Sequence, residues 1–476
     1  MMGADAASLR ARQRARFFRC GIAFAVASGM CYGLYTAFLT LAETMGPWGP
    51  WLTGGAALSS FTVTYALAAL AAGLNDLWSG VWSLLVCVRN GQIGDLVKTV
   101  RTKPGRMMML CAVVGGPFAT VCYVVALNSA TAAGAPGVIV PIAALNCAIG
   151  AVLGHVLFRQ KIAAHALAGI VVCLAAAALI GGASLTDMGP GVLVGCLSAF
   201  LAAFGWGFEG CVAGFGTVLV DYRIGIAIRQ CTAGVLELAV VFPVLAAIGD
   251  GWGAVPELLG VAVSDPSIIV FAISGLLAMP AYSFWYKGNS MCGTALGMAC
   301  NGMYAFWGPF FIWVLLGLLN VGGLSSSYPP LGAAQWAGAV VMVCGIFLIA
   351  VSPSGALRGR VGAEVRGTDF HPETSVAAPA VGSDALPLFF AVIDHFSGGV
   401  TDDAEGVVAS LRPAYAHDRQ LSAGSVSEAL ATAKENGLLD EVGSALDERG
   451  VLRVYYAMND FGRQMADRYI PSNLRG

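Results

Sequence analysis

The sequence predicts an all-α polytopic membrane protein with ten transmembrane helices, arranged as two inverted five-helix repeats, and a small α+β domain at the C-terminus. Three observations predict it. Of the 476 residues, 57% are hydrophobic and only 11% are charged, whereas soluble domains carry about 25% charged residues. Apolar runs long enough to cross the hydrocarbon of a bilayer recur throughout the first 352 residues. After residue 352 the composition changes sharply.

The first element is a basic tail, residues 1–19, followed by an apolar run at 20–42. That run is longer than the core of about 7–15 residues in a cleavable signal peptide. We therefore expect a first transmembrane helix with the N-terminus in the cytoplasm. The ten candidate spans cover residues 20–42, 50–74, 107–128, 132–158, 162–183, 190–213, 224–249, 267–287, 291–319 and 331–352.

The positions of the basic residues test this count. All fifteen Lys and Arg residues before residue 352 lie in the N-terminal tail, or in or beside loops predicted to share its side. Because cytoplasmic loops concentrate Lys and Arg, we expect a plasma-membrane protein with both termini in the cytoplasm. The apolar run 77–88 is short and contains Trp78 and Trp82, which favours an amphipathic helix lying in the inner interface over a span.

The ten spans divide into two similar halves, residues 20–183 and 190–352. Residues 163–180 and 332–349 align without gaps and share an Ala-Gly pair, a Val-Val pair and a closing Leu-Ile pair. Because five is odd, the second half enters the membrane from the opposite side. Inverted repeats are common in secondary transporters, whose sites lie near the midplane between the halves.

With this topology and repeat, the sequence resembles the drug/metabolite transporter superfamily in its EamA-type ten-helix branch, over about residues 18–352. The similar segments are Gln335–Gly338, Ala168–Gly169 and Gly205–Gly207. The family often ends its fourth helix with an acidic element, whereas this chain has Phe158–Lys161 there. The resemblance implies alternating-access transport, often export, of metabolites, amino acids or drugs.

Charged groups at membrane depth are costly, so each is a functional candidate. Glu237 lies near the middle of the predicted seventh span, where it could exchange a proton during transport or hydrogen-bond a neighbouring helix. Glu209 in the sixth span could coordinate a cationic substrate group or reach the interface. Arg229 begins the seventh span, and we interpret it as an interface anchor.

Amides and aromatic side chains complete the candidate site. Asn146 and Asn301 occupy comparable places in the two halves and could bind substrate or join helices. Aromatic faces could line a pocket for cations or flat apolar ligands, or serve only in packing. The aromatic candidates are Tyr32, Tyr35, Trp206, Tyr282, Trp285, Tyr304 and Trp307.

The sequence predicts no enzyme. The thirteen cysteines have no metal-binding spacing, the His residues are scattered, and no phosphate-binding loop of the GxxxxGK[ST] type is present. We therefore expect no metal and no cofactor.

The region after residue 352 consists of a flexible linker at 353–383, rich in Gly, Ala, Pro and Ser, and a domain at 384–476. Three predicted helices, a two-stranded hairpin and a last helix resemble a winged-helix domain. Ser425, with Glu428 three residues later, has the spacing of a capping box opening the third helix. The domain carries eight Lys or Arg and fourteen Asp or Glu, a net charge of −6, so we expect a cytoplasmic protein partner or self-association rather than nucleic acid.

The expected function is secondary transport of a small molecule across the bilayer, by alternating access and coupled to protons through Glu237. Two alternatives fit the same sequence. One is a membrane receptor or tethered regulator that signals through the C-terminal domain. The other is a flippase for lipid-linked precursors.

Overall fold

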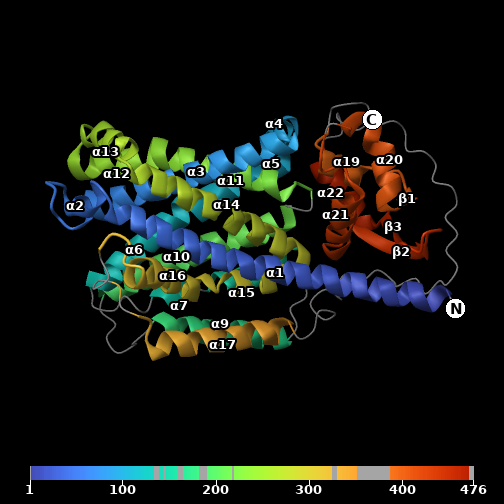
Figure 1. The fold of residues 1–476 in the computed structure, drawn as a ribbon, viewed down its shortest axis with the longest axis horizontal. Coiled ribbons are helices and arrows are strands. Elements are labelled where there is room, and N and C mark those ends of the chain that lie inside the picture. The colour runs from blue at the N-terminus through green and yellow to red at the C-terminus, as the bar shows by residue number, and fades with distance from the viewer. Residues whose placement is uncertain are drawn as a thin grey trace.

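The computed structural model describes residues 2–132, 139–143, 145–158, 164–181, 190–216, 219–323, 328, 330–350, 386–416 and 418–470. Within these residues the chain forms a long helical bundle, with a small domain containing a sheet at one end (Figure 1). The predicted linker 353–383 lies outside the described residues, as do Arg159 and Lys161.

The bundle begins with a 43-residue helix, α1 (Met2–Thr44), whose N-terminal part extends past the other helices toward the small domain (Figure 1). The predicted basic tail 1–19 is thus continuous with the first predicted span. The remaining bundle elements are α2 (Trp48–Leu52), η1 (Thr62–Ala66), α3 (Leu67–Asn90), α4 (Ile93–Arg101), α5 (Lys103–Val113), η2 (Val114–Phe118), α6 (Ala119–Ala132), α7 (Ile139–Ala143), α8 (Asn146–Phe158), α9 (Ala164–Gly181), α10 (Pro190–Gly216), α11 (Tyr222–Leu236), η4 (Glu237–Val241), α12 (Phe242–Asp250), α13 (Ala254–Ser264), α14 (Ser267–Cys292), α15 (Thr294–Asn301), α16 (Tyr304–Ile312), η5 (Trp313–Leu318) and α17 (Ala333–Ala350).

Seven helical segments of the described residues are long and apolar enough to cross a membrane. The chain is therefore an integral membrane protein. Shorter apolar helices, including Asn146–Leu157, Leu167–Ala176 and Trp336–Leu348, lie within other predicted spans. The seven long segments are Ser8–Thr44, Thr62–Asn90, Lys103–Ala126, Leu193–Ala213, Tyr222–Asp250, Ser267–Cys292 and Thr294–Leu318.

The prediction of the second span at residues 50–74 is wrong. The helix runs without a break from Thr62 to Asn90, so residues 77–88 belong to it and do not form a separate interfacial helix. Asn75 and Asp76 suggested a loop, but both are buried within α3. Partners on other helices satisfy them, since Ser274 donates a hydrogen bond to Asn75 and Arg229 pairs with Asp76. A polar pair with such partners does not end a helix.

Small residues allow the helices to approach closely. α1 packs along α14, and α3 along α11. On α1, a Cβ added at Gly33 would lie 2.5 Å from the backbone carbonyl carbon of Trp307, which is part of the α16 main chain. Backbone cannot move aside as a flexible side chain can, so this crossing requires glycine.

We expect Gly33→Ala to destabilise the protein by about 1–3 kcal/mol, the usual result of overpacking a close contact. Gly260→Ala on α13 is the matched control, because a Cβ there meets nothing within 4 Å. That control should be neutral or stabilising by up to about 1 kcal/mol, since alanine favours helices over glycine. Melting temperatures of the two variants in detergent provide the comparison. Equal melting temperatures would show that the crossing tolerates a methyl group.

The small domain comprises α19 (Leu388–Asp394), β1 (Thr401–Asp402), α20 (Ala404–Tyr415), α21 (Ala423–Glu435), β2 (Leu439–Leu446), β3 (Leu452–Met458) and α22 (Asp460–Tyr469). Its sheet is antiparallel in the order β1-β3-β2, with Thr401 opposite Ala457 and Leu439 opposite Met458. Phe390 and Phe396 are fully buried in its core. The predicted helices and hairpin are present, and β1 adds a third strand.

The prediction that Ser425 opens α21 is wrong. The helix begins at Ala423, and the side chain of Ser422 accepts a hydrogen bond from the backbone N–H of Ser425. Ser422 is therefore the N-cap, and Ser425 lies in the first turn. Both serines have a cap-compatible side chain, but only Ser422 has the extended backbone that a cap adopts.

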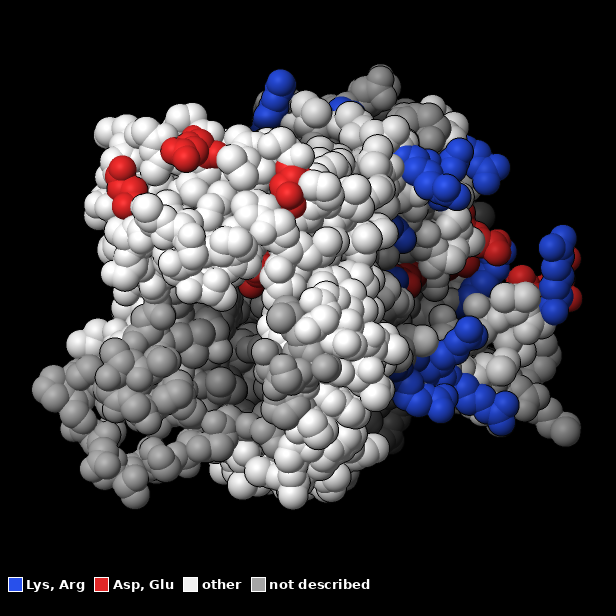
Figure 2. Space-filling view, turned by 60° about the vertical axis from the view of Figure 1, so that its left-hand side comes forward, with Lys and Arg blue, Asp and Glu red and all other residues white. Residues whose placement is uncertain are grey.

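The charged residues are distributed unevenly along the bundle. Figure 2 shows Lys and Arg side chains toward the end with the small domain, and acidic side chains on the left of the view at the other end. Part of the basic end contacts the acidic domain: Arg14 pairs with Glu435 at 3.6 Å, and Arg10 pairs with Glu441. Charge complementarity thus helps hold the domain at this end of the bundle.

Candidate functional site

A buried ionic cluster joins three long helices inside the bundle. Arg229 of α11 is 1% exposed, and its Nη1 lies 2.7 Å from Oδ2 of Asp76 on α3. Its Nε lies 2.9 Å from Oε1 of Glu209 on α10. Both carboxylates are buried as well. One guanidinium therefore bridges two carboxylates, a net charge of −1 when all three groups are ionised.

Neutral polar groups complete the coordination of this cluster. The hydroxyl of Tyr286 donates to Oε1 of Glu209 at 2.9 Å. Gln230 contacts Arg229 through its side-chain oxygen and donates to Ser79 Oγ at 2.7 Å. Gly115 of η2 lies directly against the Glu209 carboxylate, so that a side chain there would overlap it. The carboxylate position therefore depends on a glycine of the adjacent element η2.

An aromatic cluster lies next to the ionic one. The Tyr32 ring lies 4.7 Å from that of Tyr35 and 4.6 Å from that of Tyr304, between ring centroids. Tyr282 closes the group, and the guanidinium carbon of Arg229 lies 4.1 Å from its ring centroid. Cations over aromatic faces are attracted by the ring quadrupole. The four tyrosines, which we name the tyrosine cluster, thus join helices α1, α14 and α16 beside Arg229.

Of the three predicted tryptophans, one lies beside this group and two lie outside it. Trp285 is the one beside it and packs against Tyr282, with ring centroids 6.2 Å apart. Trp206 instead packs on Tyr123, and Trp307 packs among Phe306, Phe310 and Phe311. The structure therefore assigns a place beside the ionic cluster to four predicted tyrosines and Trp285, and packing positions to Trp206 and Trp307.

The predicted amides also separate. Asn301 donates to Ser28 Oγ at 2.7 Å, and Ser28 donates to the carbonyl of Ala281 at 2.7 Å. Asn301 thus links α15, α1 and α14 as a packing contact. Asn146 is buried and lines, together with Tyr304, a small cavity of about 40 Å³.

Glu237 differs from the other buried acids. It is 2% exposed, and its Oε2 has no hydrogen-bond partner among the described residues. Eight residues separate Glu237 from Arg229, about 12 Å along a helix. The uncompensated carboxyl therefore lies on the same helical segment as the ionic cluster.

The Glu237 carboxyl lies where three helices change from α to π geometry. Its small cavity is lined by Tyr65 of η1, Pro117 of η2, and Glu237 and Val241 of η4. π-Helical turns inside α-helices are rare and occur frequently at functional sites. This convergence is a second, independent reason to regard Glu237 as functional.

Sequence reasoning missed Asp76 and Tyr286 and misassigned Arg229, which is fully buried and is no interface anchor. The relevant signal was present, because a lone Arg and a lone Asp in apolar helices need partners at membrane depth. Because the second span was predicted to end at residue 74, Asp76 was assigned to a loop and was not considered as a partner for Arg229. Among the described residues, no group of three His, Cys, Asp or Glu side chains could hold a metal ion.

No known family model matches the sequence, and neither does any curated protein. The fold was also compared with solved structures, of which 17 chains match. One, described only as a crystal structure of a protein, has a TM-score of 0.45 and 16% sequence identity, and the match covers 69% of this chain and 96% of that one. This similarity is too low to establish a shared fold.

Proposed function

We propose that this protein is a secondary transporter of small metabolites or drugs that works by alternating access in the plasma membrane, in the direction of export. The proposal includes ten spans in two inverted repeats, with both termini cytoplasmic, as in the drug/metabolite transporters that the sequence resembles. The packing of α9 on α17, the two segments with the aligned repeat sequence, supports the repeat.

The ionic cluster beside the tyrosine cluster is the observation that carries the proposal. Placing Arg229, Asp76 and Glu209 inside a bundle costs several kcal/mol per ion before pairing. Apolar side chains would pack three helices without that cost. Charges at membrane depth usually serve a substrate or ion pathway, and alternating access requires polar groups that exchange partners between states.

The geometry supports a substrate that carries a positive or hydrogen-bond-donating group on a flat apolar body. In the proposed mechanism, the tyrosine cluster contacts the body, and Glu209 exchanges Arg229 for the substrate cation. Glu237 gains or loses a proton as the bundle changes state. Excess negative charge in the cluster favours a cation over an anion.

A ligand screen tests the proposal. Purified protein in detergent is heated with amino acids, nucleosides, sugars and organic cations at several pH values, because a ligand of the native state raises the melting temperature. We expect stabilisation by organic cations, followed by accumulation of the stabilising compound in proteoliposomes. Failure of every class in both assays would contradict a transport function.

A receptor is the second candidate, favoured by the contact between the small domain and the bundle. The domain contacts the ends of α11 and α14. Arg223 of α11 donates to Gln420 at 2.9 Å, Lys287 of α14 pairs with Glu428 at 2.8 Å, and Asn436 donates to the carbonyl of Ser290 at 2.9 Å. Movement of either helix would reach the domain directly. We propose that the domain is a winged-helix-like module and that, with a net charge of −6, it contacts proteins or itself rather than nucleic acid.

Deletion of residues 353–476 separates the two functions. A transporter should still move its substrate in proteoliposomes, whereas a receptor should lose its output and show no transport before or after the deletion.

A further inference from the structure

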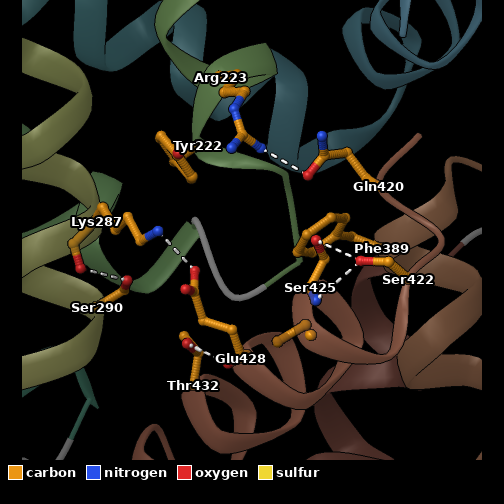
Figure 3. Close-up of a pocket in the computed structure, with 12 residues that line it drawn as sticks. Tyr222, Arg223, Lys287, Ser290, Phe389, Gln420, Ser422, Ser425, Glu428 and Thr432 are labelled. Atoms are coloured by element: carbon orange, nitrogen blue, oxygen red, sulfur yellow. Dashed lines mark hydrogen bonds and ion pairs between the residues drawn. The ribbon is translucent and has the colours of Figure 1, made fainter. Parts of the chain in front are cut away.

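A cavity of about 310 Å³ lies between the helical bundle and the small domain. Figure 3 shows its two walls: Tyr222, Arg223 and Lys287 come from the bundle, and Ser422, Ser425 and Glu428 come from the small domain. Its size lies at the lower end of the range of small-molecule sites, about 300–1,000 Å³. We name it the interface pocket. It is distinct from the ionic cluster, and none of its lining residues belongs to that cluster.

Two cations from the bundle face this pocket. Lys287 is 8% exposed, and its Nζ lies 2.8 Å from the carboxylate of Glu428, whose side chain is 42% exposed. Arg223 donates from Nη1 to Gln420 at 2.9 Å and to Asp221 at 3.3 Å. Both bonds come from the same nitrogen, Nη1, whereas a guanidinium group has five N–H donors on three nitrogens. The pocket therefore has donor capacity beyond its present bonds.

Among the described residues that line the interface pocket, Glu428 is the one acidic side chain. It is the more exposed partner of its ion pair, with a side chain 42% exposed against 10% for Lys287, so solvent can take up its carboxylate. An anion that enters the pocket can therefore replace Glu428 on Lys287, while Glu428 turns toward solvent. The buried lysine keeps a counter-charge throughout.

The first turn of α21 adds to this wall. Gly424 lines the pocket, and a Cβ added there would meet nothing within 4 Å, so the backbone is open to a ligand. The backbone N–H of Ser425 is capped by Ser422 Oγ, and the start of the helix carries partial positive charge that favours an anion. Ser422 and Ser425 supply hydroxyl groups there. Donors thus converge from the bundle and from the domain.

We propose that the interface pocket binds a small ligand through a phosphate group, held by Arg223, Lys287 and the first turn of α21. A tetrahedral oxyanion can meet donors from several directions at once, and guanidinium groups match phosphate geometry. Because the two walls belong to different parts of the chain, the ligand fastens the small domain to the bundle and reports metabolite or lipid state to it. The phosphate can belong to a soluble ester or to a lipid headgroup.

The test uses the full-length protein in detergent and two probes, sn-glycerol 3-phosphate and water-soluble dihexanoyl phosphatidylglycerol, titrated calorimetrically at constant ionic strength. We expect saturable binding of at least one probe. The tighter probe identifies the source of the phosphate as soluble or lipidic. Absence of saturable binding by both probes up to about 10 mM, far above the dissociation constant of a specific small-molecule site, would overturn the proposal.

Three variants show whether any binding occurs in this pocket. Lys287→Met and Arg223→Met should each weaken it at least about tenfold, since each removes a charge-assisted contact. Glu428→Gln should tighten it by roughly threefold or more, because it frees Lys287 and removes a competing charge. A destabilised protein would not show that gain.

Lys434→Met is the matched control. Lys434 lies on α21, the helix that carries Glu428, but it pairs with Glu435 and does not line the interface pocket. Its affinity for the probe should equal that of the unchanged protein. Equal weakening by Lys434→Met and Lys287→Met, or no gain in Glu428→Gln, would place the binding elsewhere and overturn the proposal.

Discussion

Replacing Arg229 with Met is expected to destabilise the folded protein by about 3–5 kcal/mol, the largest effect of any single change considered for this bundle. The substitution removes the one cation between Asp76 and Glu209, which lie 2.7 Å and 2.9 Å from it. Two buried carboxylates would then face each other without compensation. The melting temperature in detergent, and the fraction of protein that remains monodisperse, measure the loss.

The cause can be separated from a simple loss of side-chain volume. Combining Arg229→Met with Asp76→Asn and Glu209→Gln removes all three charges at nearly constant volume. This triple variant should recover most of the lost stability, because the unpaired carboxylates are gone. Arg223→Met provides the control on the same helix. We expect a change below about 1 kcal/mol, because Arg223 is 27% exposed and Asp221 keeps hydrogen bonds from Gln92 and from the backbone N–H of residue 223. A triple variant no more stable than Arg229→Met would contradict the electrostatic account.

Replacing Glu237 with Gln is expected to abolish the dependence of transport on an imposed pH gradient. The two side chains have nearly the same shape, but the amide cannot exchange a proton at physiological pH. Because Oε2 of Glu237 has no hydrogen-bond partner among the described residues, the change breaks no bond at that atom. Gradient-driven accumulation in proteoliposomes should fall at least about tenfold, because the amide cannot carry the proton that the gradient moves.

Exchange of substrate across the membrane without a gradient should persist in the same variant, because exchange needs no net proton movement. Glu257→Gln is the matched control, since Glu257 is exposed on α13. It should transport like the unchanged protein. Unaltered gradient dependence in Glu237→Gln would assign proton coupling to another group, or to none.

The tyrosine cluster illustrates what spacing can and cannot predict. Tyr32 and Tyr35 lie three residues apart on one helix, so their shared face follows from helical periodicity. Their contact with Tyr282 and Tyr304 depends on how α1 crosses α14 and α16. Trp206 and Trp307 are also aromatic and also lie within predicted spans. The rotation of their helices nevertheless directs them into packing contacts with other aromatic rings.

Local sequence determined the elements of this protein. Apolar length predicted most of the long helices of the bundle, although it misplaced the second. Helical spacing and turns predicted the helices and the hairpin after residue 384, because these features depend on residues a few positions apart. Tertiary structure decided the site. The partners Asp76, Glu209 and Arg229 are separated by up to 153 positions, and only the packing of α3, α10 and α11 brings them together. A charge at membrane depth predicts that a partner exists, but apolar helix surfaces, which pack in many registers, do not identify which partner it is.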